Sequence, residues 1–141
     1  VEVRYASEIP RRKLVVTIHS FGFKYGQHRM VDSIFDVRLL RNPNYRPELK
    51  PKTGKDADVA DYVFQDPAAR EMLDKINAFN KFVLPRYYKE GKSYFRLAIG
   101  CSGGRHRSVA MAERVAQHLR ENSLPNIVVA TNHRDMDKDP H

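Results

Sequence analysis

The chain has 141 residues, of which 41% are hydrophobic and 30% charged, and its formal net charge is +8 at pH 7. This length is too short for two domains of typical size, so we expect a single domain over residues 1–141 with an ordered part of about 12–134. The positive charge favours anionic partners, which include nucleic acid, phosphorylated metabolites and acidic surfaces. A basic face without a specific partner is the alternative.

Cys101 is the only cysteine, which excludes an intrachain disulfide and a thiolate zinc cluster. We therefore expect a reducing, cytoplasmic setting, with no metal and no cofactor. No apolar run approaches the roughly 20 residues of a membrane span, and residues 1–13 lack the apolar core of a signal peptide. No membrane partner is expected.

The first half of the chain predicts two strands followed by a long loop. A β-branched run predicts a strand over 12–19, and a second apolar run predicts one over 32–40. Three prolines and Gly54 prevent a continuous element over 41–56, which we expect to be an ordered loop or lid. The densest group of cations lies in or beside this loop: Arg38, Arg41, Arg46, Lys50, Lys52 and Lys55.

The second half predicts two helices and two strands. Asp66 and Pro67 are typical of a helix start, and Pro85 is expected to kink or interrupt that helix. A strand over 93–100, a helix over 106–121 and a strand over 126–131 then form a βαβ unit with a parallel pair. The polar residues 134–141 are expected to fray.

These elements predict an α/β layered domain with a mostly parallel sheet of about four or five strands. In such folds ligands bind beyond the carboxyl ends of the strands. The loops after the predicted strands 12–19, 32–40 and 93–100 all lie at that edge. We therefore expect them to share one site.

The loop "GCSGGRHRS" (100–108) combines several features that bind phosphate. Gly103 and Gly104 allow successive backbone N–H groups to face one anion, and the following helix adds its own unpaired N–H groups. Arg107 offers a bidentate fork, and His106 a further donor. The hydroxyls of Ser102 and Ser108 complete the predicted anion site. A tight turn with a basic helix start facing solvent is the alternative.

The spacing from Cys101 to Arg107 and Ser108 is also the C-x5-R-S/T spacing of cysteine phosphatases. In that hypothesis the loop lowers the thiol pKa, Cys101 attacks phosphorus, Arg107 holds the oxygens and Asp36 is the candidate acid. Gly100 stands where those enzymes usually carry histidine. Cys101 as a small, half-buried residue closing the strand is the competing interpretation.

Three stretches occur in this order: "HSFGFKYG" (19–26), "FDVRLLRNPNYRPELKPKTGKD" (35–56) and "SYFRLAIGCSGGRHRSVAMAERVAQHL" (93–119). Together they resemble the C-terminal domain of the RapZ family, bacterial RNase adapter proteins, over about residues 14–134. The resemblance implies a phosphofructokinase-like sugar-phosphate subdomain that binds a regulatory small RNA and senses glucosamine-6-phosphate.

For the ligand, the resemblance implies that Asp36 meets an amine or sugar hydroxyl. It also implies that the loop residues Ser102, Gly103, His106 and Arg107 take the phosphate. The family position after Asn-Pro is often histidine, and here it is Asn44. The P-loop motif of the family's N-terminal domain does not occur, so nucleotide hydrolysis is not expected of this chain. It is either a stand-alone relative or an excised domain.

RNA-binding relatives end in a basic tail, whereas this chain ends in "DMDKDPH". If RNA binds, the loop 38–55 contributes most, together with Lys24 and Arg105. Tyr45 either stacks on an unpaired base or packs within its loop.

Three hypotheses remain open at this point. The first is a regulatory domain that binds a sugar phosphate, RNA or both, in which phosphate or sulfate occupies the same loop. The second is the cysteine phosphatase. The third is a module that contacts a nuclease or another protein as a homo-oligomer.

Overall fold

The computed structural model describes residues 12–122 and 124–138. Its four strands are β1 (Leu14–Gly22), β2 (Ser33–Asp36), β3 (Tyr94–Cys101) and β4 (Ile127–His133). Its α-helices are α2 (Ala57–Phe64), α3 (Pro67–Lys89) and α4 (Arg107–Glu121), and two short 3-10 turns are η1 (Phe23–Tyr25) and η2 (Pro43–Tyr45). The predicted α/β class is confirmed.

The four strands form one sheet in the order β2-β3-β1-β4, and every neighbouring pair is parallel. The mostly parallel sheet predicted from the sequence is therefore confirmed. The predicted direct pairing of 93–100 with 126–131 is wrong, because β1 lies between β3 and β4 and pairs with both. The connection from β3 to β4 therefore passes over β1, a strand from the start of the chain.

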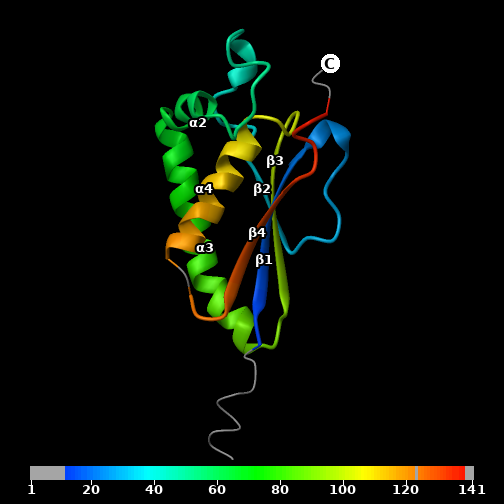
Figure 1. Ribbon diagram of the computed structural model, residues 1–141, viewed down its shortest axis with the longest axis vertical. Coiled ribbons are helices and arrows are strands. Elements are labelled where there is room, and N and C mark those ends of the chain that lie inside the picture. Colours follow the sequence, from blue (N-terminus) through cyan, green and yellow to red (C-terminus); the bar gives the residue numbers. More distant parts are fainter. Residues whose placement is uncertain (1–11, 123, 139–141) are drawn as a thin grey trace, which may run out of the picture.

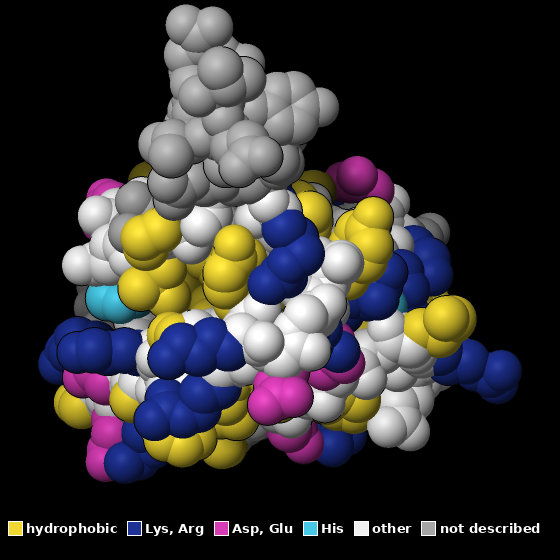
Figure 2. All heavy atoms as spheres, turned by 90° about the horizontal axis from the view of Figure 1, so that it is seen from below, with side chains coloured by type: hydrophobic (Ala, Val, Ile, Leu, Met, Phe, Trp, Pro, Cys, Tyr) yellow, Lys and Arg dark blue, Asp and Glu magenta, His cyan; other side chains and the backbone are white. Residues whose placement is uncertain are grey.

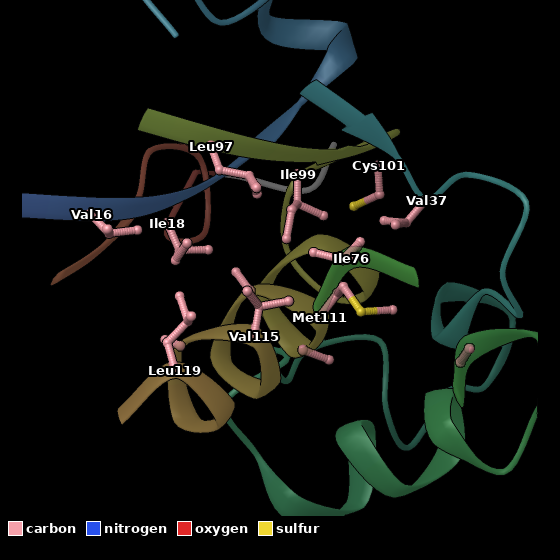
Figure 3. Packing of buried hydrophobic residues seen from close by; sticks show 14 of the residues in the cluster. Val16, Ile18, Val37, Ile76, Leu97, Ile99, Cys101, Met111, Val115 and Leu119 are labelled. Carbon is pink, nitrogen blue, oxygen red and sulfur yellow. The ribbon is translucent and has the colours of Figure 1, made fainter. Parts of the chain in front are cut away.

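The helices lie together on one side of the sheet (Figure 1). Alternate residues of β1, such as Leu14, Val16 and Ile18, point to this side and are fully buried. They pack with Ile76 of α3 and with Val115 of α4 (Figure 3). The hydrophobic core is thus a single layer between the helices and one face of the sheet.

Among the described residues, the other face of the sheet is covered only near its carboxyl end, where η1 and the segment after it lie (Figure 1). Farther down, Tyr94 is 54% exposed and Val128 is 45% exposed. Parallel sheets in α/β proteins are normally covered on both faces. The part of the chain that the structure describes therefore leaves some of this face uncovered.

Three sequence-based expectations require correction here. Helix α3 runs through Pro85 without interruption, because Leu84 before it is buried in the core and Tyr87 after it packs against the core. Helix α2 was not predicted. Residues 134–138 do not fray, since Asp135 is 1% exposed and accepts a hydrogen bond from the Gly22 amide. Residues 139–141 lie outside the described residues.

Candidate functional site

A cavity of about 150 Å³ lies at the carboxyl end of the sheet. Its walls come from the segments that follow β1, β2 and β3, together with residue 138, so the expected convergence of these loops is confirmed. The lining residues are Lys24, Tyr25, Asn42, Asn44, Cys101, Ser102, Gly103, Arg105, His106, Arg107 and Lys138.

Two glycines bring the β3–α4 loop close to the end of β1. A Cβ atom on Gly104, whose φ is +77°, would lie 2.5 Å from the Gly22 nitrogen. A Cβ on Gly22 would lie 2.4 Å from the Gly103 carbonyl carbon. Gly103 itself has open space around its Cβ position and lines the cavity. Gly104 therefore packs the loop, while Gly103 faces the ligand space.

Arg107 begins α4, and its side chain is both buried and charged. It is 5% exposed, and its Nη1 donates to the carbonyl oxygens of Arg38 at 2.7 Å and Leu40 at 3.1 Å. Its Nη2 lies 3.4 Å from the Ser102 hydroxyl. No carboxylate of the described residues lies within 4.0 Å of this guanidinium. A buried cation without a counter-ion beside a cavity favours an anionic ligand.

His106 precedes α4 and is also buried, at 6% exposure. Its Nε2 donates to the Lys50 carbonyl oxygen at 3.1 Å, which ties the basic loop to the start of the helix. Burial is the main cause that lowers the pKa of His106. His106 is therefore neutral at pH 7, and because its single N–H already bonds the Lys50 carbonyl oxygen, it holds the basic loop in place rather than donating to an anion.

The N–H groups at the start of α4 are available for a ligand. Among the described residues, no acceptor takes the amide hydrogens of Arg105, His106 or Arg107. Together with Gly103 they form a run of donors around the loop that lines the cavity. Such a run, with the positive end of the helix dipole behind it, is suited to a phosphate-sized anion.

Cys101 is 2% exposed and belongs to the hydrophobic core as well as to the cavity wall. Its side chain points inward beside Val37 and Ile99 (Figure 3). Its thiol donates to the Ser108 hydroxyl at 3.1 Å, and its sulfur accepts from the Gly104 amide at 3.3 Å. This placement favours Cys101 and Ser108 as packing residues beneath the loop. The phosphatase hypothesis stays a prediction.

Asp36 ends β2 and does not line the cavity. Its carboxylate is held by Arg38, which donates from Nε at 3.0 Å and from Nη2 at 2.6 Å. This side-chain pair is the main cause that lowers the pKa of Asp36. The guanidinium of Arg38 also stacks 3.9 Å from the centre of the Phe23 ring. The proposed contact of Asp36 with a ligand amine therefore stays a prediction.

Of the other predicted basic residues, Lys24 and Arg105 line the cavity. Arg105 donates to the carbonyl oxygens of Lys52 at 3.0 Å and Met136 at 2.9 Å, and also to that of Pro51. It thus joins the basic loop to the C-terminal segment.

The remaining cations of the basic loop are partly neutralised. Arg46 pairs with Glu48, and Lys52 pairs with Asp58 of α2. Arg41 stacks on Tyr62 at 5.1 Å. Basic side chains also occur at the opposite end of the molecule, interspersed with acidic and hydrophobic ones (Figure 2). The positive charge is therefore not confined to the cavity, and the distinctive feature of the cavity is burial rather than charge alone.

The sequence reasoning missed three lining residues, Tyr25, Asn42 and Lys138. Asn42 has a recognisable signal, since Asn before Pro43 is typical of a cap, and its Oδ1 accepts from the Asn44 amide at 3.0 Å. Lys138 has no such signal. It reaches the cavity because Asp135 anchors the segment and pairs with Lys138 at 2.6 Å.

Two further searches concern metals and membranes. Among residues 12–122 and 124–138, no group of three or more His, Cys, Asp and Glu side chains is arranged to hold a metal ion. Within the same residues, no helix has the length and apolarity that a membrane crossing requires.

The fold and the cavity define a class of protein: a small parallel α/β domain in which a glycine-rich loop between β3 and α4 lines a cavity at the carboxyl end of the sheet. The family model described as the RapZ C-terminal domain matches residues 14–137. The chain therefore belongs to the RapZ C-terminal domain family, as its motifs predicted.

Curated relatives carry the description nucleotide-binding protein. One from Brevibacillus brevis is 49% identical over 125 residues, which is 89% of this chain and 41% of the relative. One from Sphingopyxis alaskensis is 50% identical, covering 89% of this chain and 39% of the relative. One from Rubrobacter xylanophilus is 45% identical, covering 89% and 41%. The chain thus spans about two fifths of the length of these relatives.

Proposed function

We propose that this chain is a regulatory binding domain whose cavity holds the phosphate of a phosphorylated amino sugar. The observation that carries the proposal is Arg107, a buried guanidinium that faces the cavity with no carboxylate partner among the described residues. The N–H groups of the loop supply further donors. Family membership supports glucosamine-6-phosphate as the first ligand to test.

The test is a thermal-shift and calorimetric titration with glucosamine-6-phosphate, glucose-6-phosphate and inorganic phosphate. We expect all three to stabilise the chain and the amino sugar to bind best, if Asp36 meets the amine. Charge-assisted bonds of this kind contribute about 1.5–3 kcal/mol, so Arg107→Lys is expected to weaken binding at least about tenfold.

Arg86→Lys is the matched control, because Arg86 is exposed on α3 and is not a lining residue. No stabilisation at millimolar concentrations of any of the three ligands contradicts the proposal. The same preparation tests the phosphatase hypothesis. Turnover of an aryl phosphate that disappears in Cys101→Ser supports an enzyme, and equal inertness of both proteins rejects it.

We infer RNA as a second ligand, on the basis of Tyr45. This side chain is 81% exposed on η2, so the expectation that it packs within its loop is wrong. The same turn carries Asn42 and Asn44, which line the cavity. An exposed aromatic ring beside cations is suited to stacking on an unpaired base.

The chain has no tryptophan, so Tyr45→Trp introduces a single tryptophan, whose fluorescence can be excited selectively over that of the tyrosines. We expect single-stranded oligonucleotides to quench it and to bind with a steep salt dependence. Tyr94→Trp is the control, since Tyr94 is exposed on the sheet face. Equal quenching of both variants, or a flat salt dependence, contradicts RNA binding at Tyr45.

A further inference from the structure

The lining of the cavity carries more positive charge than a single phosphate requires. Among the described residues that line it, none is an aspartate or glutamate, and four are cationic: Lys24, Arg105, Arg107 and Lys138. The proposed function uses Arg107, which is buried beside the glycine loop. Lys24 and Lys138 are exposed, so they lie at the mouth of the cavity. The cavity therefore has cations at two depths.

The β3–α4 loop itself holds both lysines close to the first phosphate position. The Lys24 amide donates to the Ser102 carbonyl oxygen at 3.1 Å. Arg105 of the same loop donates from Nη1 to the Met136 carbonyl oxygen at 2.9 Å, which fixes the segment that carries Lys138. The positions of the two lysines are thus set by bonds between this loop and the backbone on either side of it.

The ammonium groups of the two lysines meet at one aromatic ring. Nζ of Lys24 lies 5.1 Å from the centre of the Tyr25 ring, and Nζ of Lys138 lies 4.6 Å from it. The two ammonium groups are therefore at most about 10 Å apart, close to the Debye length of about 8–10 Å, so their charges repel each other. Asp135 offsets only part of this charge, because its carboxylate pairs with Arg134 at 2.8 Å as well as with Lys138 at 2.6 Å. An anion between the two lysines relieves the repulsion.

We propose that Lys24 and Lys138 form a second anion site at the mouth of the cavity, and that the ligand is a sugar with two phosphate groups. The proposal rests on the proposed function, since the loop and Arg107 must hold the first phosphate. The second phosphate accepts a charge-assisted hydrogen bond from each ammonium group. The side-chain amides of Asn42 and Asn44 also line the cavity and are donors and acceptors suited to the hydroxyls of the sugar between the two phosphates.

The experiment is a calorimetric titration of the parent chain with glucose-1,6-bisphosphate, glucose-6-phosphate and inorganic phosphate. We expect the bisphosphate to bind about tenfold more tightly than glucose-6-phosphate. Because the second site is exposed, this preference is expected to shrink when the salt concentration is raised from about 50 mM to about 500 mM. If glucose-6-phosphate and inorganic phosphate both fail to bind, the proposed function fails as well. If they bind and the bisphosphate binds no more tightly, the second anion site alone is refuted.

Variants of Lys24 separate a local site from a general attraction to a basic chain. Lys24→Gln removes the charge and keeps the backbone bond to Ser102, so it is expected to abolish the preference for the bisphosphate and to leave the affinity for glucose-6-phosphate nearly unchanged. Lys24→Arg keeps the charge and is expected to retain the preference. Lys75→Gln is the matched control, since Lys75 is exposed on α3 and does not line the cavity. Equal weakening of both ligands by Lys24→Gln, or the same loss of preference in Lys75→Gln, overturns the proposal.

The neighbouring phosphates of a nucleic-acid strand are another source of two linked anions. A dinucleotide with a 5′-phosphate carries two phosphates joined through a ribose, and it is titrated under the same conditions. We expect it to bind less tightly than glucose-1,6-bisphosphate. Tighter binding of the dinucleotide assigns both anion sites to nucleic acid and overturns the proposal.

Discussion

The two adjacent glycines of the β3–α4 loop allow a sharp test of how the cavity is built. Gly104 has a φ of +77°, and a Cβ there would lie 2.5 Å from the Gly22 nitrogen and 2.9 Å from the Asp135 Cβ. Gly103 has no atom within 4 Å of its Cβ position. Gly104→Ala is therefore expected to destabilise the domain, and Gly103→Ala is expected to leave its stability almost unchanged.

The magnitude follows from two contributions. The left-handed backbone costs a non-glycine residue about 1–2 kcal/mol, and the displacement of the β1 end costs about 1–3 kcal/mol. Their sum is about 2–5 kcal/mol, a large part of the about 5–15 kcal/mol that stabilises a typical domain. At about 3 °C per kcal/mol for a chain of this size, the midpoint of thermal unfolding falls by about 6–15 °C.

The assay is urea unfolding followed by circular dichroism, with thermal melts of the same samples. Gly103→Ala serves as the control for folding and as a probe of the cavity, because its methyl group enters the ligand space. We expect it to weaken phosphate binding while its free energy of unfolding stays within about 0.5 kcal/mol of that of the parent. Equal stability of Gly104→Ala and Gly103→Ala would refute the close packing of the loop against β1.

Three further changes have expected outcomes. Asp135→Asn weakens the anchor of the C-terminal segment. Burial alone raises the pKa of Asp135, but the bonds from Arg134, Gly22 and Lys138 outweigh burial, so the net pKa is lowered. In urea unfolding, the variant is therefore expected to be less stable than the parent at pH 7, and the difference is expected to shrink as the pH falls below about 4. Burial lowers the pKa of His19 to about 4, so the parent chain is expected to lose about 2 kcal/mol of its free energy of unfolding between pH 6.5 and pH 4, allowing for partial solvation. His19→Phe, which also removes two buried unpaired nitrogens, is expected to remove this loss of stability at acid pH. The same loss of stability in His19→Phe would count against His19 as its cause. The Ser20 hydroxyl lies 2.6 Å from Nδ1 of His133, whose Nε2 lies 2.7 Å from Glu113. Ser20→Ala breaks this chain of hydrogen bonds and is expected to lower the free energy of unfolding, followed by thermal melts, by about 1–3 kcal/mol. Unchanged stability would show that this buried chain of hydrogen bonds does not stabilise the domain.

The order of the main elements and the meeting of three loops at one edge were predictable from local patterns. The β-branched run of β1, the Asp66 cap and the glycine loop each depend on a few neighbouring residues. The position of β1 between β3 and β4 was not predictable in this way, because strand order is decided by packing between distant segments. Helix α2 was missed because the prolines and glycine of 41–56 dominate the pattern just before it.

The site shows the same limit. Arg107, His106 and Gly103 were identified because they belong to one short motif. Lys138 was not, because its place depends on Asp135 reaching the Gly22 amide across 113 residues of chain. Whether a polar segment frays or docks is decided by such distant partners rather than by its own composition.

The central position of β1 has a consequence for how the domain is made. Val15 pairs with Tyr94, 79 residues later, and Leu14 pairs with Ile127, 113 residues later. Contacts between such distant residues slow folding, because a long loop must close before any contact stabilises it. During synthesis, β1 therefore cannot pair with either neighbour until β3 and β4 have been made. The cavity is complete only when residue 138 has left the ribosome. A nascent chain stalled before β4 would expose an uncovered central strand, which makes this stage the one at which the protein is most prone to aggregate.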